Sequence, residues 1–288
     1  MNLRAEAEEK SVAKLPWAHL RLPPFPQVAI RVLQLANNEN VQLHQLCDLI
    51  SSDPAFASEV LTVANSLLYA PRYPSTSILQ AVAVLGANTL QGMCVTVGIR
   101  AYLGRQMNLP AMRKLWRHNL ACAIIAQRMA GAGFIDSDQA YTSGILHDIG
   151  TFISPQSHQK HSSYLIDAAD IFGLRKADKD IVSKVALYHR RQVPGPSDPA
   201  YMSLSRHDRA VVSKLAAILR VSEALDKSHQ QKIRDFTLER DRDMIMIHPI
   251  GDPVDLSMER QALAKKDSLF TDVLGAILVL KQEAVART

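Results

Sequence analysis

Residues 144–150 read Gly-Ile-Leu-His-Asp-Ile-Gly, which places an adjacent histidine and aspartate, His147 and Asp148, inside an otherwise apolar stretch. Burying these two polar groups costs free energy unless both are satisfied. A divalent metal would satisfy both, because imidazole and carboxylate are ligands that suit Mn, Fe, Mg, Zn and Ni. Hydrogen bonds at a helix end would satisfy them as well. The pair alone does not decide between these alternatives.

The chain on either side of this stretch has the spacing of helices. Apolar residues recur every three to four positions, the helix period, in a series of segments. These segments are 28–36, 43–51, 55–66, 77–85, 89–103, 114–130, 138–150, 162–172, 179–190 and 206–228. Residues 236–250 alternate imperfectly around a charged centre and predict a hairpin, whereas 258–280 return to helical spacing. The sequence therefore predicts a mostly all-α fold with a short C-terminal β-hairpin and a final helix.

The helical pattern stops at Leu109-Pro110 and starts again directly afterwards, which indicates a boundary. Four parts are expected: a polar N-terminal tail at 1–14, a helical unit at 15–109, a helical domain with the His-Asp pair at 110–229, and the hairpin with its helix at 230–288. Within the first unit, Ser52-Asp53-Pro54 predicts a helix start, with Asp53 as the cap and Pro54 in the first turn.

Composition narrows the class of protein. Of 288 residues, 47% are hydrophobic and 21% are charged, which excludes long disorder and leaves enough apolar residues for a large core. The cysteines Cys47, Cys94 and Cys122 are odd in number and each lies in an apolar run, so buried thiols in a reducing compartment are expected. Neither a targeting segment nor a membrane span is apparent, which predicts a cytoplasmic protein.

The net charge of +5 is unevenly placed. Residues 1–110 carry eight basic and seven acidic side chains, so most of the excess positive charge lies in the second half. An anionic partner is therefore expected there. Nucleic acid is disfavoured, because the charge is weak and no aromatic residues are interleaved with the basic ones.

Further potential metal ligands lie on both sides of the His-Asp pair. His118 precedes the pair, His158, His161 and His189 follow it, and Asp226 ends an apolar helical run. The order His118, His147-Asp148 and Asp226 resembles that of the HD superfamily of metal-dependent phosphohydrolases. The segments HDIGTFI, HQKHSSYLI, VALYHRRQVP and KLAAILRVSEALDKSH resemble the C-terminal HD domain of the exopolyphosphatase/guanosine pentaphosphate phosphatase family, and this likeness continues through 230–288.

The first unit resembles the HD-related output domain (HDOD) family. The motifs that carry this resemblance are LPPFP at 22–26, ISSDP at 50–54, LTVANS at 61–66 and AVAVLG at 81–86. These motifs indicate the fold and say little about chemistry.

The HD resemblance implies one or two divalent ions of Mn, Fe, Ni, Co, Mg or Zn. His118, His147, Asp148 and Asp226 would hold the first ion. Asp148 would bridge to a second ion held by His161 and His189, with His158 as the weaker alternative to His161. Two ions would polarise a phosphoryl oxygen and activate a water, which makes Asp148 the expected catalytic residue.

Arg190 and Arg191 lie beside His189, where guanidinium groups would bind phosphate in a bidentate manner. Lys160 and Arg220 are weaker candidates, and a solvated helix end is the alternative for the two arginines. Thr151 and the lack of a recognisable GYP motif disfavour cyclic-di-GMP hydrolysis. The actin-like domain of exopolyphosphatases is absent here, so that activity is not carried over.

Two functions are compatible with these observations. The first is a metal-dependent phosphohydrolase of the HD superfamily, acting on a nucleotide or other phosphoester in signalling. The alternative is a non-catalytic HDOD signalling module with a protein partner, whose metal site is structural or only binds a ligand. The oligomeric state stays open.

Overall fold

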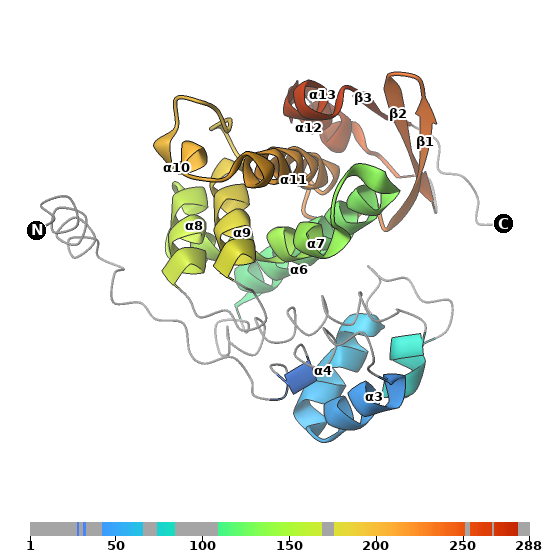
Figure 1. The fold of residues 1–288 in the computed structure, drawn as a ribbon. Coiled ribbons are helices and arrows are strands. Elements are labelled where there is room, and N and C mark those ends of the chain that lie inside the picture. Colours follow the sequence, from blue (N-terminus) through green and yellow to red (C-terminus); the bar gives the residue numbers. More distant parts are fainter. Residues whose placement is uncertain are drawn as a thin grey trace, which may run out of the picture.

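The computed structural model describes residues 28, 31–32, 42–65, 74–83, 109–168, 176–250, 254–266 and 268–281. Within these residues the chain is mostly helical, and a small sheet lies near the C-terminus (Figure 1). This confirms the predicted mostly-α fold class. The helix expected at 89–103 and the motif at 22–26 lie outside the described residues.

The N-terminal unit contains α3 (Leu43–Ser51), α4 (Pro54–Ala64) and a helical stretch at 78–83. The predicted helix start at Asp53 is confirmed, because its side chain accepts hydrogen bonds from the backbone N–H groups of Ala55 and Phe56, each at 3.0 Å. At the other end of α4, the Asn65 side chain bonds both the N–H and the carbonyl of Ser75. This amide therefore joins the end of α4 to the start of the next helical stretch.

A second group of helices carries the His-Asp pair. Its elements are α6 (Pro110–Met129), the π-helical turn η2 (Ala130–Phe134), α7 (Ser137–Leu146), the 3-10 turn η3 (Ile149–Phe152), α8 (His158–Ala168), α9 (Lys176–Tyr188), α10 (Pro199–Met202) and α11 (Arg206–Leu225). The long α11 lies between α6, α7 and α9 on one side and the C-terminal elements on the other (Figure 1). None of the described helices is long and apolar enough to cross a membrane.

Both glycines of the 144–150 stretch lie where helices touch. A Cβ atom at Gly144 would be 2.4 Å from the Cα of Ala123 on α6. A Cβ atom at Gly150 would be 2.3 Å from the carbonyl oxygen of His158 at the start of α8. The first glycine therefore allows α7 to approach α6, and the second allows η3 to approach α8.

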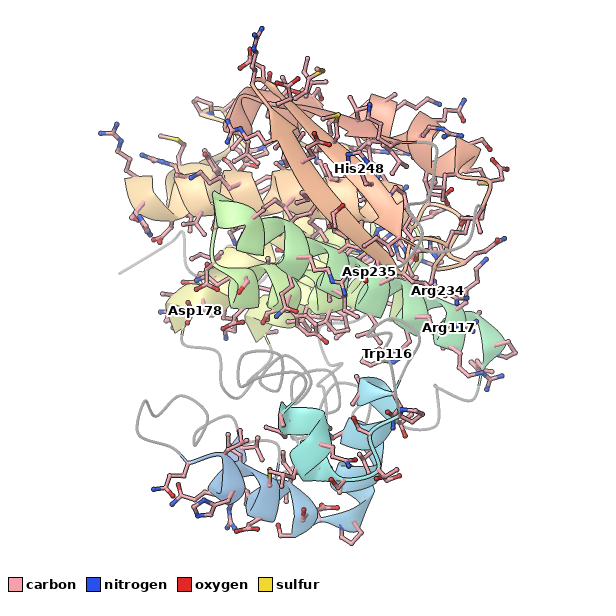
Figure 2. The ribbon with its side chains drawn as sticks, turned by 90° about the vertical axis from the view of Figure 1, so that its right-hand side faces the viewer. Trp116, Arg117, Asp178, Arg234, Asp235 and His248 are labelled. Carbon is pink, nitrogen blue, oxygen red and sulfur yellow. The ribbon has the colours of Figure 1, made fainter. Side chains whose placement is uncertain are left out.

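Two apolar cores hold these layers together. The first combines N-terminal residues such as Ile50 and Val60 with Trp116 on α6 and Ile145 on α7. Trp116 lies on the side of α6 that faces the N-terminal helices (Figure 2). Because this core includes residues from both sides of 109–110, the two units pack on each other, and the boundary drawn there stays a prediction.

The second core joins the opposite face of α6 to α9, α11 and the C-terminal elements. Its members include Ile125, Met129, Leu215, Ile218, Ile247 and Leu278. Arg128 near the end of α6 also pairs with Asp235, which lies at the start of β1 (Figure 2). The C-terminal elements are therefore part of the same packed body as the helices that carry the His-Asp pair.

The C-terminal part begins with the predicted hairpin, formed by β1 (Asp235–Asp241) and β2 (Met244–Ile250) as an antiparallel pair. The expected single helix over 258–280 is wrong at its end, where a strand replaces it, and the part before it forms two helices. The structure has α12 (Ser257–Lys266), α13 (Ser268–Leu274) and β3 (Ile277–Leu280), which pairs with β2 in parallel. Gly275, at φ +67°, ends α13, and the short apolar run after it joins the sheet. Periodicity alone cannot distinguish a short apolar strand from a helix.

Candidate metal centre

The chain turns sharply at the His-Asp pair. Helix α7 ends at Leu146, His147 is its C-cap residue, and Asp148 precedes the 3-10 turn η3. His147 is fully buried and Asp148 is 6% exposed. Both side chains therefore leave the end of a helix in the protein interior, where they cannot be satisfied by bulk water.

Three buried histidines share one orientation. In His147, His158 and His189 the ring Nδ1 atom donates a hydrogen bond to the carbonyl oxygen three residues earlier. These acceptors are the carbonyls of Gly144 at 2.7 Å, Pro155 at 2.9 Å and Ala186 at 2.6 Å. A carbonyl oxygen can only accept, so Nδ1 carries the proton and Nε2 of the neutral ring carries a lone pair.

The three Nε2 atoms meet at one carboxylate. Asp148 Oδ1 lies 3.0 Å from His158 Nε2 and 3.3 Å from His189 Nε2, and Asp148 Oδ2 lies 3.7 Å from His147 Nε2. The Nε2 atoms of His158 and His189 are 3.2 Å apart. Among the described residues, Asp148 Oδ1 and His147 Nε2 have no hydrogen-bond partner. Such closely spaced buried acceptors are unfavourable unless a cation or a proton lies among them.

The pKa values of the side chains in this cluster favour the binding of a cation. Burial lowers the pKa of His147 to about 4, which keeps its ring neutral at pH 7. Burial raises the pKa of Asp148, but the surrounding histidines outweigh it and hold that pKa well below the ordinary value. Burial lowers the pKa of His158, whereas the carboxylate of Asp148 raises it by more. A charged carboxylate among imidazole lone pairs is a donor set for a divalent metal.

A second group of ligand atoms lies on the α6 side of His147. His118 is 1% exposed, and its Nδ1 donates to Asp226 Oδ2 at 2.8 Å, which leaves Nε2 with a lone pair. Cys122 Sγ lies 3.6 Å from that Nε2 atom. The ligand atoms of His118, Cys122 and His147 all lie within 4.8 Å of one another, as do those of His147, Asp148 and His189. The two groups therefore share His147.

Asp226 lies outside both groups. Its Oδ1 accepts a hydrogen bond from the backbone N–H of Gln231 at 2.8 Å, and its Oδ2 accepts from His118 and from the Gln231 side chain. A carboxylate in this position orients the imidazole and raises its basicity as a ligand. In this arrangement Asp226 acts on a metal through His118, and direct ligation by Asp226 stays a prediction.

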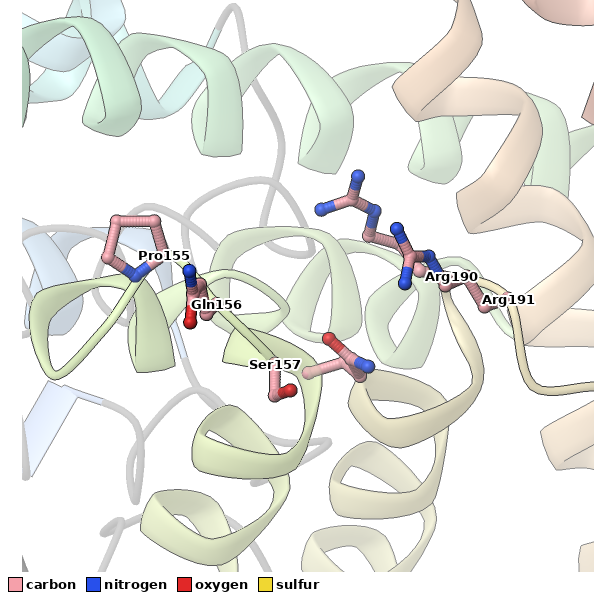
Figure 3. Close-up of a pocket in the computed structure, with 6 residues that line it drawn as sticks. Pro155, Gln156, Ser157, Arg190 and Arg191 are labelled. Carbon is pink, nitrogen blue, oxygen red and sulfur yellow. The ribbon is translucent and has the colours of Figure 1, made fainter.

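A cavity of about 410 Å³ opens beside the cluster. Arg190 and Arg191 line one side of it, and Pro155, Gln156 and Ser157 line the other (Figure 3). Arg190 Nη1 lies 3.4 Å from His158 Nε2, so this arginine reaches from the cavity wall to the histidine cluster. The cavity is at the small end of the size range of small-molecule sites.

The structure thus brings together most of the residues that the sequence singled out. His118, His147, Asp148 and His189 converge, and Asp226 contacts His118. His158, the weaker candidate, is the histidine placed 3.0 Å from Asp148, while His161 on α8 belongs to neither group of mutually close ligand atoms. Lys160 is exposed and is not among the residues that line the cavity. Arg220 instead donates to the carbonyls of Tyr188 and Gln192, which fixes the chain on either side of the arginine pair.

Three residues near the centre were missed in the sequence. Cys122 lies four residues after His118, a spacing that places both on one helix face and was a usable signal. The His229 ring stacks on His118, with ring centroids 3.7 Å apart. Glu223 lies near the cluster, and although burial raises its pKa, Lys266 and the nearby histidines lower it to about 2. Glu223 therefore adds a negative charge close to the proposed cation.

Family comparisons agree with this arrangement. The HDOD domain family matches residues 22–183, and the family "Ppx/GppA phosphatase, domain III" matches residues 136–272. An uncharacterized protein of Treponema pallidum (strain Nichols) is 27% identical over 137 residues, which are 46% of this chain. The aligned part is 26% of that protein, so the chain matches about a quarter of this curated relative.

Two solved structures are similar in fold. An HDOD domain protein with unknown function from Geobacter sulfurreducens has a TM-score of 0.51 and 20% identity, over 94% of this chain and 95% of that one. A protein of Shewanella amazonensis SB2B named "Putative metal-dependent phosphohydrolase" has a TM-score of 0.51 and 16% identity, over 95% and 97% of the two chains. At these identities the likeness is one of fold. Because the HDOD domain match covers more than half of the sequence, the chain belongs to the HDOD domain family.

Proposed function

We propose that this chain is a metal-dependent phosphohydrolase of the HD type, acting on a nucleotide or another phosphoester in signalling. The observation that carries the proposal is the set of imidazole Nε2 lone pairs around Asp148, in which two buried acceptor atoms lack a hydrogen-bond partner. A purely structural cluster would be expected to pair such groups. The name of the Shewanella relative agrees with this class of reaction.

The proposed centre has a simple division of roles. His147, His158, His189 and Asp148 would hold a divalent ion, and His118 with Asp226 behind it would hold a second. When bound, such ions polarise a phosphoryl oxygen and lower the pKa of a coordinated water. The protein keeps the three imidazoles in the ligating tautomer through their Nδ1 hydrogen bonds to backbone carbonyls.

The arginine-lined cavity is the proposed site for the phosphate group of the substrate. Arg190 reaches both the cavity and His158, so an anion bound there would lie next to the metal centre. Two residues of the cavity wall, Ser157 and Arg191, have positive φ angles of 54° and 42°. Such strained backbone is concentrated at functional sites, because the surrounding structure must maintain it.

The proposal is tested with a panel of phosphomonoesters, phosphodiesters and nucleotides. Each is incubated with the purified chain after chelator treatment and after reloading with Mn²⁺, Ni²⁺, Co²⁺ or Mg²⁺. We expect phosphate release with at least one metal and none in the chelated protein. Bound metal without turnover of any substrate would contradict the enzymatic proposal.

Replacing Arg190 with alanine is expected to weaken phosphate binding without removing the metal. Hydrogen bonds to charged groups contribute about 1.5–3 kcal/mol, so the affinity for inorganic phosphate should fall about tenfold to a hundredfold. The measurement is calorimetric titration of the metal-loaded protein. Arg206→Ala, which removes an exposed arginine at the start of α11, is the matched control. Equal phosphate affinities in both variants would exclude Arg190 from the site.

One observation favours a second function, that of a non-catalytic signalling module. Both carboxylate oxygens of Asp226 are engaged by His118 and Gln231, and Asp226 belongs to neither group of close ligand atoms. A centre that lacks this ligand would bind a metal or a nucleotide without turning it over. The substrate panel distinguishes the two functions, because the module would retain metal and bind phosphate but release no product.

A further inference from the structure

A cysteine thiol lies at the proposed metal centre, in a position that the proposed function does not use. His118 and Cys122 are four residues apart on α6, so their side chains leave the same face of the helix. Cys122 is fully buried, and its Sγ is 3.6 Å from Nε2 of His118. The sulfur also lies 3.9 Å from Nδ1 of the same ring, and Nε2 is the nitrogen with the lone pair, because Nδ1 donates to Asp226.

His147 supplies a third potential ligand atom beside Cys122 and His118. The evidence for it does not depend on the cysteine. His147 Nε2 is buried and without a hydrogen-bond partner among the described residues. A ring nitrogen of His147 lies within 4.8 Å of both Cys122 Sγ and a ring nitrogen of His118. An unsatisfied buried nitrogen on an imidazole beside a thiol and a second imidazole has an electron pair available for a cation. The three atoms come from two helices that Gly144 allows to pack closely.

The spacing suits a tetrahedral ion. Ligands at about 2.3 Å for sulfur and about 2.0 Å for nitrogen lie roughly 3.5 Å apart around a tetrahedral metal. The 3.6 Å between Cys122 Sγ and His118 Nε2 is close to this separation, and because Sγ is 3.9 Å from Nδ1, a small rotation of the side chains is needed to place the sulfur around an ion on the Nε2 lone pair. A hydrogen bond from the thiol to the imidazole would give a similar distance, so the two arrangements must be separated by experiment.

We propose that Cys122 is a metal ligand, together with His118 and His147, so that one ion of the centre is bound by two nitrogens and a sulfur. This inference rests on the proposed metal centre and deepens it by naming the class of metal. Thiolate ligands favour Zn²⁺, Fe²⁺ or Co²⁺ over Mg²⁺. On binding, the thiol loses its proton to solvent and the sulfur donates an electron pair to the metal, with no change in oxidation state.

The sharing of His147 defines what remains for the other ion. Each Nε2 atom has one lone pair and binds one ion. With His147 in the sulfur-containing group, His158, His189 and Asp148 remain for the second ion, and their close atoms lie within 3.3 Å of one another. The two sites then differ in chemistry, since one includes a thiolate and the other a carboxylate.

Cobalt substitution tests the inference by absorption spectroscopy. The full chain is treated with chelator and titrated with Co²⁺ without oxygen, and the near-ultraviolet band of thiolate-to-cobalt charge transfer is recorded. We expect this band in the natural sequence and in a Cys47→Ser/Cys94→Ser double variant, which keeps Cys122 alone. The band should be absent from Cys122→Ser and Cys122→Ala, whose zinc affinity should fall at least about tenfold, whereas Co²⁺ should still bind the carboxylate-containing site.

The outcomes separate this inference from the proposed function. If the natural chain binds Co²⁺ without the charge-transfer band, or if the band survives in Cys122→Ser, the thiol is not a ligand and the proposed function stands. If the natural chain binds no metal at all, the proposed metal centre fails as well. X-ray absorption of the zinc-loaded natural protein gives the answer without any variant, because a sulfur neighbour at about 2.3 Å is expected. Only nitrogen and oxygen neighbours would overturn the inference.

Discussion

An Asp148→Asn variant is expected to lose its divalent metal while keeping its fold. The carboxylate is the negatively charged ligand of the proposed centre, and three imidazole nitrogens face it at 3.0, 3.3 and 3.7 Å. Asparagine has nearly the same shape, but it is neutral and a far weaker metal ligand. Substitution of residues that only support metal ligands typically reduces affinity 10–100-fold, so loss of a direct charged ligand should cost at least about a hundredfold. Metal-dependent phosphate release should disappear with the metal.

The same variant is also expected to change the melting temperature of the metal-free protein. The asparagine amide donates N–H groups, and the neighbouring Nε2 atoms of His158 and His189 are acceptors. These hydrogen bonds replace only part of the stabilisation that the carboxylate receives, because the surrounding histidines hold the pKa of Asp148 well below its ordinary value. Without metal, the variant should therefore unfold at a lower temperature than the natural chain at pH 7. Elemental analysis and thermal melts in chelator are the two measurements.

The control for this variant is Asp167→Asn. Asp167 is an exposed carboxylate on α8 that pairs with Lys184 at 3.5 Å, and surface pairs of this kind contribute little to stability. It should leave both metal content and melting temperature nearly unchanged. If Asp148→Asn contained as much metal as the natural chain, the ion would be bound at another place in the protein. An unchanged or higher melting temperature of Asp148→Asn in chelator would show that the surrounding histidines do not stabilise the carboxylate in the metal-free protein.

The centre itself was largely visible in the sequence, because its residues have distinctive chemistry and a fixed order. The choice between His158 and His161 was not. They lie three residues apart on α8, a spacing at which both face similar directions, and only the close approach of η3 to α8 at Gly150 brings His158 to Asp148. Such an approach depends on packing between helices, which spacing along one helix does not reveal.

Two other misses have different causes. The odd number of cysteines predicts a buried thiol at Cys122, and only its spacing from His118 indicates that the two side chains share a helix face. The four apolar residues of the strand Ile277–Leu280 fit the helix period as well as the strand period, and the partner strand Met244–Ile250 is distant in sequence. In both cases the deciding information was a neighbour in space.

The glycines that flank the His-Asp pair connect the fold to the site. Gly144 permits the contact between α7 and α6 that brings His147 near His118, and Gly150 permits the contact that brings Asp148 near His158. The proposed metal centre therefore depends on the absence of two Cβ atoms as much as on its histidines and aspartate. This dependence can be tested at Gly144. There, helix propensity and packing between helices predict changes of opposite sign in the free energy of unfolding.

Gly144→Ala is expected to destabilise the protein by about 3 kcal/mol or more, although alanine is the better helix former. Helix propensity alone predicts a gain of about 1 kcal/mol. The new Cβ would lie 2.4 Å from Ala123 Cα, 2.7 Å from Ala123 N and 3.0 Å from Cys122 C, all of them backbone atoms of α6 that no side-chain rotation can move. The two helices must separate, and overpacking of this kind costs about 1–3 kcal/mol, or more where backbone must shift. Urea unfolding of the chelated protein measures the change.

Gly131→Ala is the matched control, because a Cβ there would meet nothing within 4 Å and its φ is not positive. This variant should be as stable as the natural chain or gain up to about 1 kcal/mol, through reduced freedom of the unfolded chain. Since α6 and α7 carry His118 and His147, Gly144→Ala should also bind metal more weakly when it folds, and Gly131→Ala should not. If Gly144→Ala unfolds at the same urea concentration as Gly131→Ala, the helices are not held at the distance described, and His147 is not held beside His118 by their contact.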